Sequence, residues 1–260
     1  MINIFRSIRV IAYREFLRFF QDRSRMISSF TMPILFLVIF GAGFGELIGQ
    51  MMPGVDYMQF MYPGILAMTV LMTSVMSGVS IVWDREFGFL KEVLVSPLNR
   101  SGILLGKAAG AAGIAIIQGM IMLVLAPIVG VSINLGTVLS LIPLLLILSI
   151  SLSGLGLLIG SRMRSQQGFQ LLMQLVIFPM MFLSGIFFPL SGVATWLEVL
   201  SKINPVTYGI DAIRQVFLGS ETAALTIFGH TMSIFESALV VAVVGSLLLG
   251  AAIWSFNRQK

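Results

Sequence analysis

A short stretch with two glycines and a lysine is the part of the chain that most resembles a catalytic motif. Residues 102–108 read GILLGKA, which superficially resembles a loop that binds nucleotide phosphates. Such a loop needs a longer spacing between its glycines, and a Ser or Thr after the lysine to hold magnesium. Here Ala108 follows Lys107, and the stretch enters an apolar helix instead of following a strand. We therefore expect no ATPase site on this chain.

Other catalytic chemistries lack the residues that they need. The chain has no cysteine, which excludes disulfides, thiolate metal sites and a cysteine nucleophile. His230 is the single histidine, so a centre with several histidine ligands is impossible. The sequence contains neither HExxH nor GxSxG, the motifs of zinc and serine hydrolases. We expect no catalytic residue, metal or cofactor on this chain.

The charged stretch 84–100, DREFGFLKEVLVSPLNR, is where residue type and spacing indicate a function. As a helix it would carry a narrow apolar stripe, formed by Trp83, Phe87, Leu90 and Leu94. The opposite side would carry charges, namely Asp84, Arg85, Lys91 and Glu92. Pro97 would end the helix. We expect the stripe to pack on the rest of the protein and the charges to contact a partner.

Composition places this stretch in a membrane protein. Of 260 residues, 57% are hydrophobic and only 10% are charged, and the mean hydropathy is +1.00. A soluble domain has about 25% charged residues. The basic residues are not gathered into a patch with interleaved aromatics, so we expect no nucleic-acid partner.

Hydrophobic runs predict an all-α membrane protein with six transmembrane helices. A helix needs about 20 apolar residues to cross the hydrocarbon core. The runs that qualify are 26–47, 58–82, 103–126, 137–160, 169–189 and 234–256. Residues 1–25 interleave arginines with apolar side chains, which favours a helix lying in the lipid headgroup layer over a merely positive flank.

The distribution of basic residues predicts the orientation. Of 16 Lys and Arg residues, only Lys202 and Arg214 fall on the side opposite the termini. By the positive-inside rule, both termini are then cytosolic. No acidic residue is predicted at mid-membrane, because Glu46 and Glu236 lie near the outer ends of their spans. This disfavours an ion-coupled carrier, which needs such groups.

Glycines at a spacing of four indicate close helix packing. The sets are Gly41 and Gly45, Gly102, Gly106 and Gly110, and Gly156 and Gly160. An oligomer contact at these glycines is the alternative.

The long stretch 190–233 lies outside, yet it is rich in apolar residues. Two short half-buried helices with a turn at Asn204-Pro205 fit this pattern better than a solvated loop does. Asp211 and Arg214, three residues apart, can form an ion pair on one helix face.

Two segments together carry a resemblance to a known family. They are DREFGFLKEVLVSPLNR after the second span and GIFFPLSGVATWLEVLSKINPVTYGIDAIR after the fifth. With the arginine-rich first helix and six spans, they resemble the ABC type-2 transporter permease family. The drug- and antibiotic-resistance exporters are more similar than the polysaccharide exporters. The resemblance covers essentially the whole chain, 1–260, as one transmembrane domain.

The resemblance implies roles for particular residues. The family's cytosolic coupling helix, which contacts the ATPase, corresponds to Asp84, Arg85, Glu86, Phe87, Gly88, Leu90, Lys91 and Glu92, with Pro97 and Arg100 closing it. Its outer re-entrant helices correspond to about 190–222 and include Pro189, Asn204, Pro205, Tyr208, Asp211 and Arg214. The family has no diagnostic substrate motif, so no substrate residue is inferred.

The function implied is that of a permease subunit in an ATP-driven exporter of amphipathic drug-, antibiotic- or lipid-like molecules. In the family, a permease dimer in the membrane docks two separate cassette ATPase subunits, which bind ATP and magnesium. The chain is then not an enzyme by itself, and it lies in the cytoplasmic membrane of a prokaryote in contact with lipids. Export of a lipid-linked polysaccharide and an ion-coupled secondary transporter are the alternatives.

Overall fold

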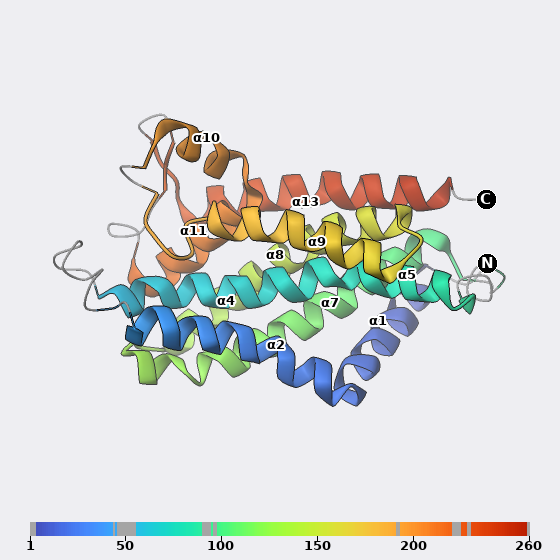
Figure 1. Ribbon diagram of the computed structural model, residues 1–260, viewed down its shortest axis with the longest axis horizontal. Coiled ribbons are helices and arrows are strands. Elements are labelled where there is room, and N and C mark those ends of the chain that lie inside the picture. The colour runs from blue at the N-terminus through green and yellow to red at the C-terminus, as the bar shows by residue number, and fades with distance from the viewer. Residues whose placement is uncertain are drawn as a thin grey trace.

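The computed structural model describes residues 4–43, 45, 56–89, 95, 98–190, 193–219, 225–227 and 230–258. Long helices run side by side along the longest axis of the molecule (Figure 1). In chain order the elements are α1 (Ile4–Gln21), α2 (Arg23–Phe36), the π-helical η1 (Leu37–Gly43), α4 (Tyr57–Val75), the 3-10 turn η2 (Met76–Gly78), α5 (Val79–Glu86), α7 (Arg100–Leu123), the 3-10 turn η3 (Ala126–Val129), α8 (Leu135–Arg162), α9 (Gln166–Phe182), α10 (Thr195–Ile203), α11 (Pro205–Leu218), β1 (Thr226–Ile227), β2 (His230–Thr231) and α13 (Ile234–Asn257).

In the part of the chain that the structure describes, five helices are long and apolar enough to cross a membrane. They are Arg23–Gly41, Tyr57–Glu86, Arg100–Leu123, Leu135–Arg162 and Ile234–Asn257. Five of the six predicted spans are therefore confirmed by length and composition. The predicted span 169–189 is shorter than expected, because α9 stops at Phe182 and the chain turns at Gly185, whose φ is +78°. A helix of 17 residues is about 25 Å long.

Polar side chains set where the long helices begin. Each accepts a hydrogen bond from a backbone N–H of the first turn, which has no partner within the helix. These N-caps are Asp22, Asp56, Asn99, Asn134, Ser165 and Ser233. Asp22 accepts from the N–H of Arg25 at 3.0 Å. The segment 1–25 is therefore not one helix as expected, because Asp22 starts α2 inside it.

Helix α1 packs on the glycine stripe of α7. A Cβ added at Gly102, Gly106 or Gly110 would lie within 2.8 Å of a Cβ of α1. At Gly106 it would lie 2.7 Å from Ile11 Cβ and 2.9 Å from the Ile8 carbonyl. These glycines allow the two backbones to approach closely, as their spacing predicted. An oligomer contact at this stripe is wrong, since α1 of the same chain occupies it.

The other glycine pairs have different outcomes. Gly156 and Gly160 of α8 pack against backbone carbonyls of Val75 and Gly78, which confirms close packing there. Gly41 faces the side chain of Met58. A Cβ at Gly45 would meet no atom of the described residues within 4 Å, so close packing is not seen there.

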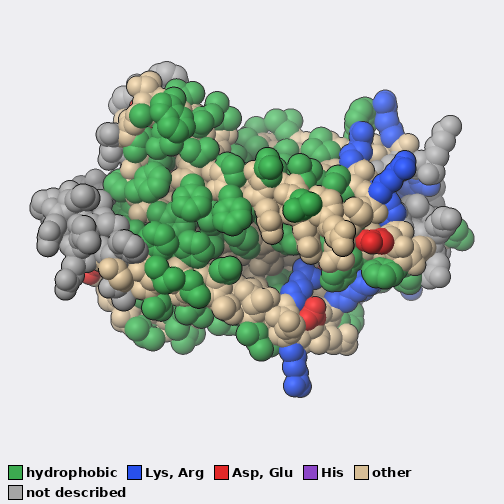
Figure 2. Space-filling view, in the orientation of Figure 1, with side chains coloured by type: hydrophobic (Ala, Val, Ile, Leu, Met, Phe, Trp, Pro, Cys, Tyr) green, Lys and Arg blue, Asp and Glu red, His purple; other side chains and the backbone are tan. Residues whose placement is uncertain are grey.

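Both ends of the chain lie at the same end of the bundle (Figure 1). Lys and Arg side chains gather there, and hydrophobic side chains cover the middle of the visible face (Figure 2). We call it the basic end: it contains α1, the end of α5, the start of α7 and the α8–α9 turn. Asn257 near the C-terminus donates to Ser101 at the start of α7.

The opposite end carries α10, α11 and a small departure from an all-helical fold. The strands β1 and β2 pair antiparallel, with Thr226 opposite Thr231 and Ile227 opposite His230. Helix α10 exposes apolar side chains such as Trp196 and Ile203. Helix α11 is buried along residues 206–215.

Candidate coupling site at the basic end

A buried ion-pair cluster is centred on Asp84, near the end of α5. Its carboxylate accepts hydrogen bonds from Lys107 Nζ at 3.0 Å, from Arg14 Nη2 at 2.8 Å and from Arg18 Nη1 at 3.5 Å. The Asp84 and Lys107 side chains are each 2% exposed. A buried charge without a partner is strongly unfavourable. The three cations therefore explain how this carboxylate can lie inside the protein.

Lys107 makes two further contacts within the cluster. Its ammonium group, which has three donors, also donates to Glu15 Oε1 at 2.9 Å and to Ser80 Oγ at 2.7 Å. Glu15 belongs to α1, Ser80 to α5 and Lys107 to α7. The cluster therefore links three helices through side chains alone.

The next two residues bind the α8–α9 turn. Arg85 donates to the Ser161 carbonyl at 2.8 Å and to the Met163 carbonyl. Glu86 Oε2 accepts from the N–H of Gln166 at 3.0 Å. These are backbone groups at the end of α8 and the start of α9, which lack partners within their helices. Residues 84–86 thus connect α5 to α1, α7, α8 and α9.

The chain then turns outward at the tip of the basic end. Phe87 is 79% exposed, Gly88 has a φ of +77°, and Phe89 is 41% exposed. Arg14 Cζ lies 4.7 Å from the centroid of the Phe89 ring. The predicted coupling residues Leu90, Lys91 and Glu92, and the predicted helix end at Pro97, lie outside the described residues. Arg100 is the exposed first residue of α7.

The predicted faces of this segment are wrong for Asp84, Arg85 and Phe87. Asp84 points into the protein and Arg85 binds carbonyls of the same chain, whereas Phe87 points outward. The reason is local: α5 ends at Glu86, and Gly88 adopts a left-handed conformation. The helical periodicity that started at Trp83 therefore stops before it reaches Leu90.

The predicted outer residues lie at the opposite end, away from this cluster. Asn204 caps α11 through the N–H of Val206 at 3.1 Å and donates to the Met180 carbonyl at 2.6 Å. Pro205 is the first residue of α11, where its missing N–H is tolerated. Tyr208 donates to the Lys202 carbonyl at 2.6 Å, which fastens α11 to α10. Pro189 lies in the partly exposed loop after α9.

Asp211 and Arg214 do not form the predicted ion pair. Asp211 accepts from Gln215 Nε2 at 2.8 Å, Ser237 Oγ at 2.7 Å and the Leu225 N–H at 2.7 Å. Arg214 donates to the Gly185 carbonyl at 2.7 Å, and its Cζ lies 3.9 Å from the Phe60 ring centroid. The two side chains have different neighbours: Asp211 accepts from Ser237 of α13, and Arg214 lies against Phe60 of α4.

The sequence matches one family along most of its length. The model for "ABC-2 type transporter" matches residues 6–218. The chain belongs to the ABC-2 type transporter family. As in that family, this ABC-2 permease is a multi-pass membrane protein and a component of a transporter.

Named relatives of the permease agree. It is 31% identical over 247 residues to the transport permease ycf38 of Cyanophora paradoxa, covering 92% of this chain and 82% of that protein. It is 27% identical over 227 residues to the inner membrane transport permease YadH of Escherichia coli K12, covering 86% and 84%. It is 32% identical over 209 residues to YbhR of the same organism, named as a multidrug ABC transporter permease, covering 80% of this chain and 54% of YbhR.

The permease has site residues that sequence reasoning missed. From the sequence, a helix in the lipid headgroup layer is expected to contain Arg14, Glu15 and Arg18. Lys107 lies in a stretch that does not meet the requirements of a phosphate-binding loop. One signal pointed to them: a lysine inside an apolar helix requires a partner. Which carboxylates supply it depends on how α1 and α5 pack on α7.

Proposed function

We propose that this chain is the permease subunit of an ATP-driven exporter. It moves amphipathic drug-, antibiotic- or lipid-like molecules outward across the cytoplasmic membrane of a prokaryote. Two copies of the chain form the pathway, and two separate cassette ATPase subunits, which bind ATP and magnesium, drive it between inward- and outward-facing states. Family membership supports the transporter role, and the name of YbhR supports drug-like substrates.

The observation that carries the ATPase-driven mechanism is the way residues 84–89 are anchored. Asp84 binds α1 and α7, while Arg85 and Glu86 bind the ends of α8 and α9. Phe87 projects beyond them. A partner that pushes on this exposed tip would move several helices together, because each of these helices is hydrogen-bonded to residues 84–86. This is the mechanical requirement for coupling an external motor to alternating access.

The proposed topology places the basic end in the cytosol. Lys and Arg cluster there in the structure, and the positive-inside rule assigns such an end to the cytosol (Figure 2). Helix α9 then acts as the sixth span, completed by local thinning of the bilayer. Helices α10 and α11 re-enter the outer leaflet, with the buried α11 and its residues Asp211 and Arg214 fixed by neighbouring helices.

The coupling role is tested by changing the exposed tip. Phe87→Asp is compared with Phe235→Asp, since Phe235 is 75% exposed but lies at the start of α13, at the other end of the bundle. We expect Phe87→Asp to weaken co-purification of the cassette ATPase, and permease-stimulated ATP hydrolysis, by about tenfold or more, as for a buried aromatic anchor in an interface. Phe235→Asp should change neither. Wild-type binding by the folded Phe87→Asp variant would contradict the proposal.

A further inference from the structure

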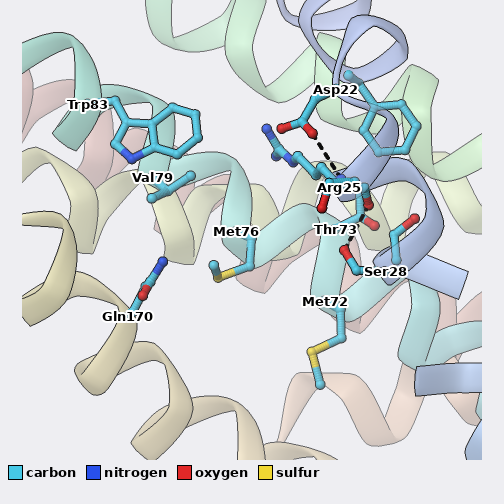
Figure 3. Close-up of a pocket in the computed structure, with 12 residues that line it drawn as sticks. Asp22, Arg25, Ser28, Met72, Thr73, Met76, Val79, Trp83 and Gln170 are labelled. Atoms are coloured by element: carbon cyan, nitrogen blue, oxygen red, sulfur yellow. Dashed lines mark hydrogen bonds between the residues drawn. The ribbon is translucent and has the colours of Figure 1, made fainter. Parts of the chain in front are cut away.

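A cavity of about 490 Å³ opens beside the junction of α1 and α2. Its walls come from that junction, from α4, η2 and α5, and from α9 through Gln170 (Figure 3). A smaller hollow of about 290 Å³ adjoins it and shares Asp22, Arg25 and Trp83 with it. Volumes of about 300–1,000 Å³ are typical of small-molecule sites.

Hydrogen-bond donors without an acceptor lie at one end of this cavity. Within the described residues, the Arg25 guanidinium makes no hydrogen bond or ion pair, and Trp83 Nε1 is buried without an acceptor. The nearest carboxylates are engaged elsewhere: Asp22 caps α2 and Glu15 binds Lys107. A buried donor without an acceptor is unfavourable. Arg25 lines the cavity, so a ligand with an acceptor group at this point would pair with its guanidinium.

The deeper hydroxyl groups of the wall already have partners. Thr73 Oγ1 donates to Gln118 Oε1 at 2.5 Å, and Gln118 Nε2 donates to Ser29 Oγ at 2.8 Å. Gln118 is fully buried in α7. This network joins α2, α4 and α7 behind the cavity. Among the described lining residues, Arg25 is therefore the cation without a partner.

An apolar strip runs from the Arg25 end of the cavity toward the middle of the bundle. Val79, Met76 and Met72 follow Trp83 in succession along α5, η2 and α4 (Figure 3). Methionine side chains adapt to apolar ligands of different shape. The cavity is thus polar near the basic end and apolar toward the bilayer centre, which is the orientation of an amphiphile in a membrane.

We propose that this cavity binds an anionic amphiphile, with its carboxylate or phosphate on Arg25 and its apolar body along Trp83, Val79, Met76 and Met72. Binding itself needs no ATPase. Only the statement that the ligand is cargo rests on the proposed export function.

The test uses Trp83 as its own reporter. The chain has three tryptophans, so Trp196→Phe with Trp254→Phe leaves Trp83 alone. Dibromostearate and its methyl ester have the same quenching tail and differ only in the charge of the head. We expect saturable quenching, with an apparent Kd about tenfold lower for the acid, the size expected for a charge-assisted hydrogen bond. Equal affinities in the otherwise unchanged protein would overturn the proposal.

Variants locate the charge that is recognised. Arg25→Gln should abolish the preference for the acid, and Arg25→Lys should restore part of it. Arg9→Gln, at an exposed position of α1 outside this cavity, should leave the preference intact. A folded Arg25→Gln variant that still prefers the acid would also overturn the proposal.

Further measurements distinguish a bilayer lipid from a single-chain amphiphile as the ligand, and they test whether a second copy of the chain fills the cavity. In nanodiscs, stronger quenching by tail-brominated phosphatidylglycerol than by phosphatidylcholine would support a bilayer lipid as the occupant. Quenching by dibromostearate alone would support a single-chain amphiphile. Efficient disulfide formation between copies carrying Met76→Cys would show that a second copy fills the cavity, against the proposal. If ATPase co-purification depends on Phe87 but the quenching of Trp83 shows no preference for the acid, this inference fails and the proposed function stands. If the quenching prefers the acid but co-purification does not depend on Phe87, only the proposed ATPase coupling fails.

Discussion

Lys107 and Asp84 form an ion pair of 3.0 Å in which both side chains are 2% exposed. The two residues lie 23 positions apart, in α7 and α5. Glu15 and Arg14 of α1 complete the pair on either side. Because α1 has no covalent link to α5 or α7 near this point, the ion pairs and the glycine contacts hold it in place. This pair therefore joins α1 to the segment that is proposed to contact the ATPase.

Breaking this pair should destabilise the permease. Asp84→Asn leaves Arg14 without its carboxylate and leaves Lys107 with Glu15 as its one acidic partner. Removal of one partner of a buried pair costs about 3–5 kcal/mol. Thermal unfolding in detergent measures this loss. Adding Lys107→Met should recover part of it, which a double-mutant cycle detects. Glu198→Gln, which breaks the exposed pair with Lys202, should cost less than about 1 kcal/mol. An unchanged unfolding temperature for Asp84→Asn would contradict the stabilising role.

Gly106→Val should detach α1 from α7. The new side chain would start 2.7 Å from Ile11 Cβ, and overpacking of this kind costs about 1–3 kcal/mol. Hydrogen exchange of α1 amides should become faster, while that of α8 stays the same. Gly250→Val is the matched control, because a Cβ there would meet no atom of the described residues within 4 Å. Equal protection of α1 in both variants would show that the stripe does not hold the helix.

Asp211 should be required for the connection between α11 and α13. Asp211→Ala leaves the Leu225 N–H and the Ser237 hydroxyl without their acceptor, while the Gln215 amide keeps the Met232 carbonyl. Each buried donor without an acceptor costs about 1–3 kcal/mol, and the Leu225 amide should exchange faster with solvent. Asp211→Asn keeps an acceptor oxygen and should be milder. If both variants were as stable as the wild type, the network would not hold α13.

The orientation can be tested with single cysteines, because the chain has none. Phe87→Cys and Trp196→Cys place a thiol at exposed positions. Phe87 directly follows α5 and Trp196 belongs to α10, and the end of α5 and α10 lie at opposite ends of the bundle (Figure 1). An impermeant maleimide should label the Trp196→Cys variant in intact cells and the Phe87→Cys variant only in inverted membrane vesicles. The opposite pattern would reverse the topology.

Some of the site could be predicted because its signals are local. The spacing of Gly102, Gly106 and Gly110 predicted a close helix contact, and the structure confirms it. The identity of the neighbour could not be predicted, because a glycine stripe accepts any helix. The outward position of Phe87 differs from the prediction, which continued the helix beyond Glu86. The left-handed turn at Gly88 interrupts the helix there.

The sequence by itself determined that this is a helical membrane protein of the ABC-2 type. Hydropathy, the asymmetry of basic residues and the two segments that resemble the family depend on residue identity alone, so they are apparent from the sequence. Only the tertiary structure decided which charges are buried and which are exposed. Asp84 pairs with Arg14, 70 positions away, and with Lys107, 23 positions away. Arg25 and Trp83 line the same cavity. Such pairings depend on how helices pack, because the energy of a charge depends on the groups that surround it in space.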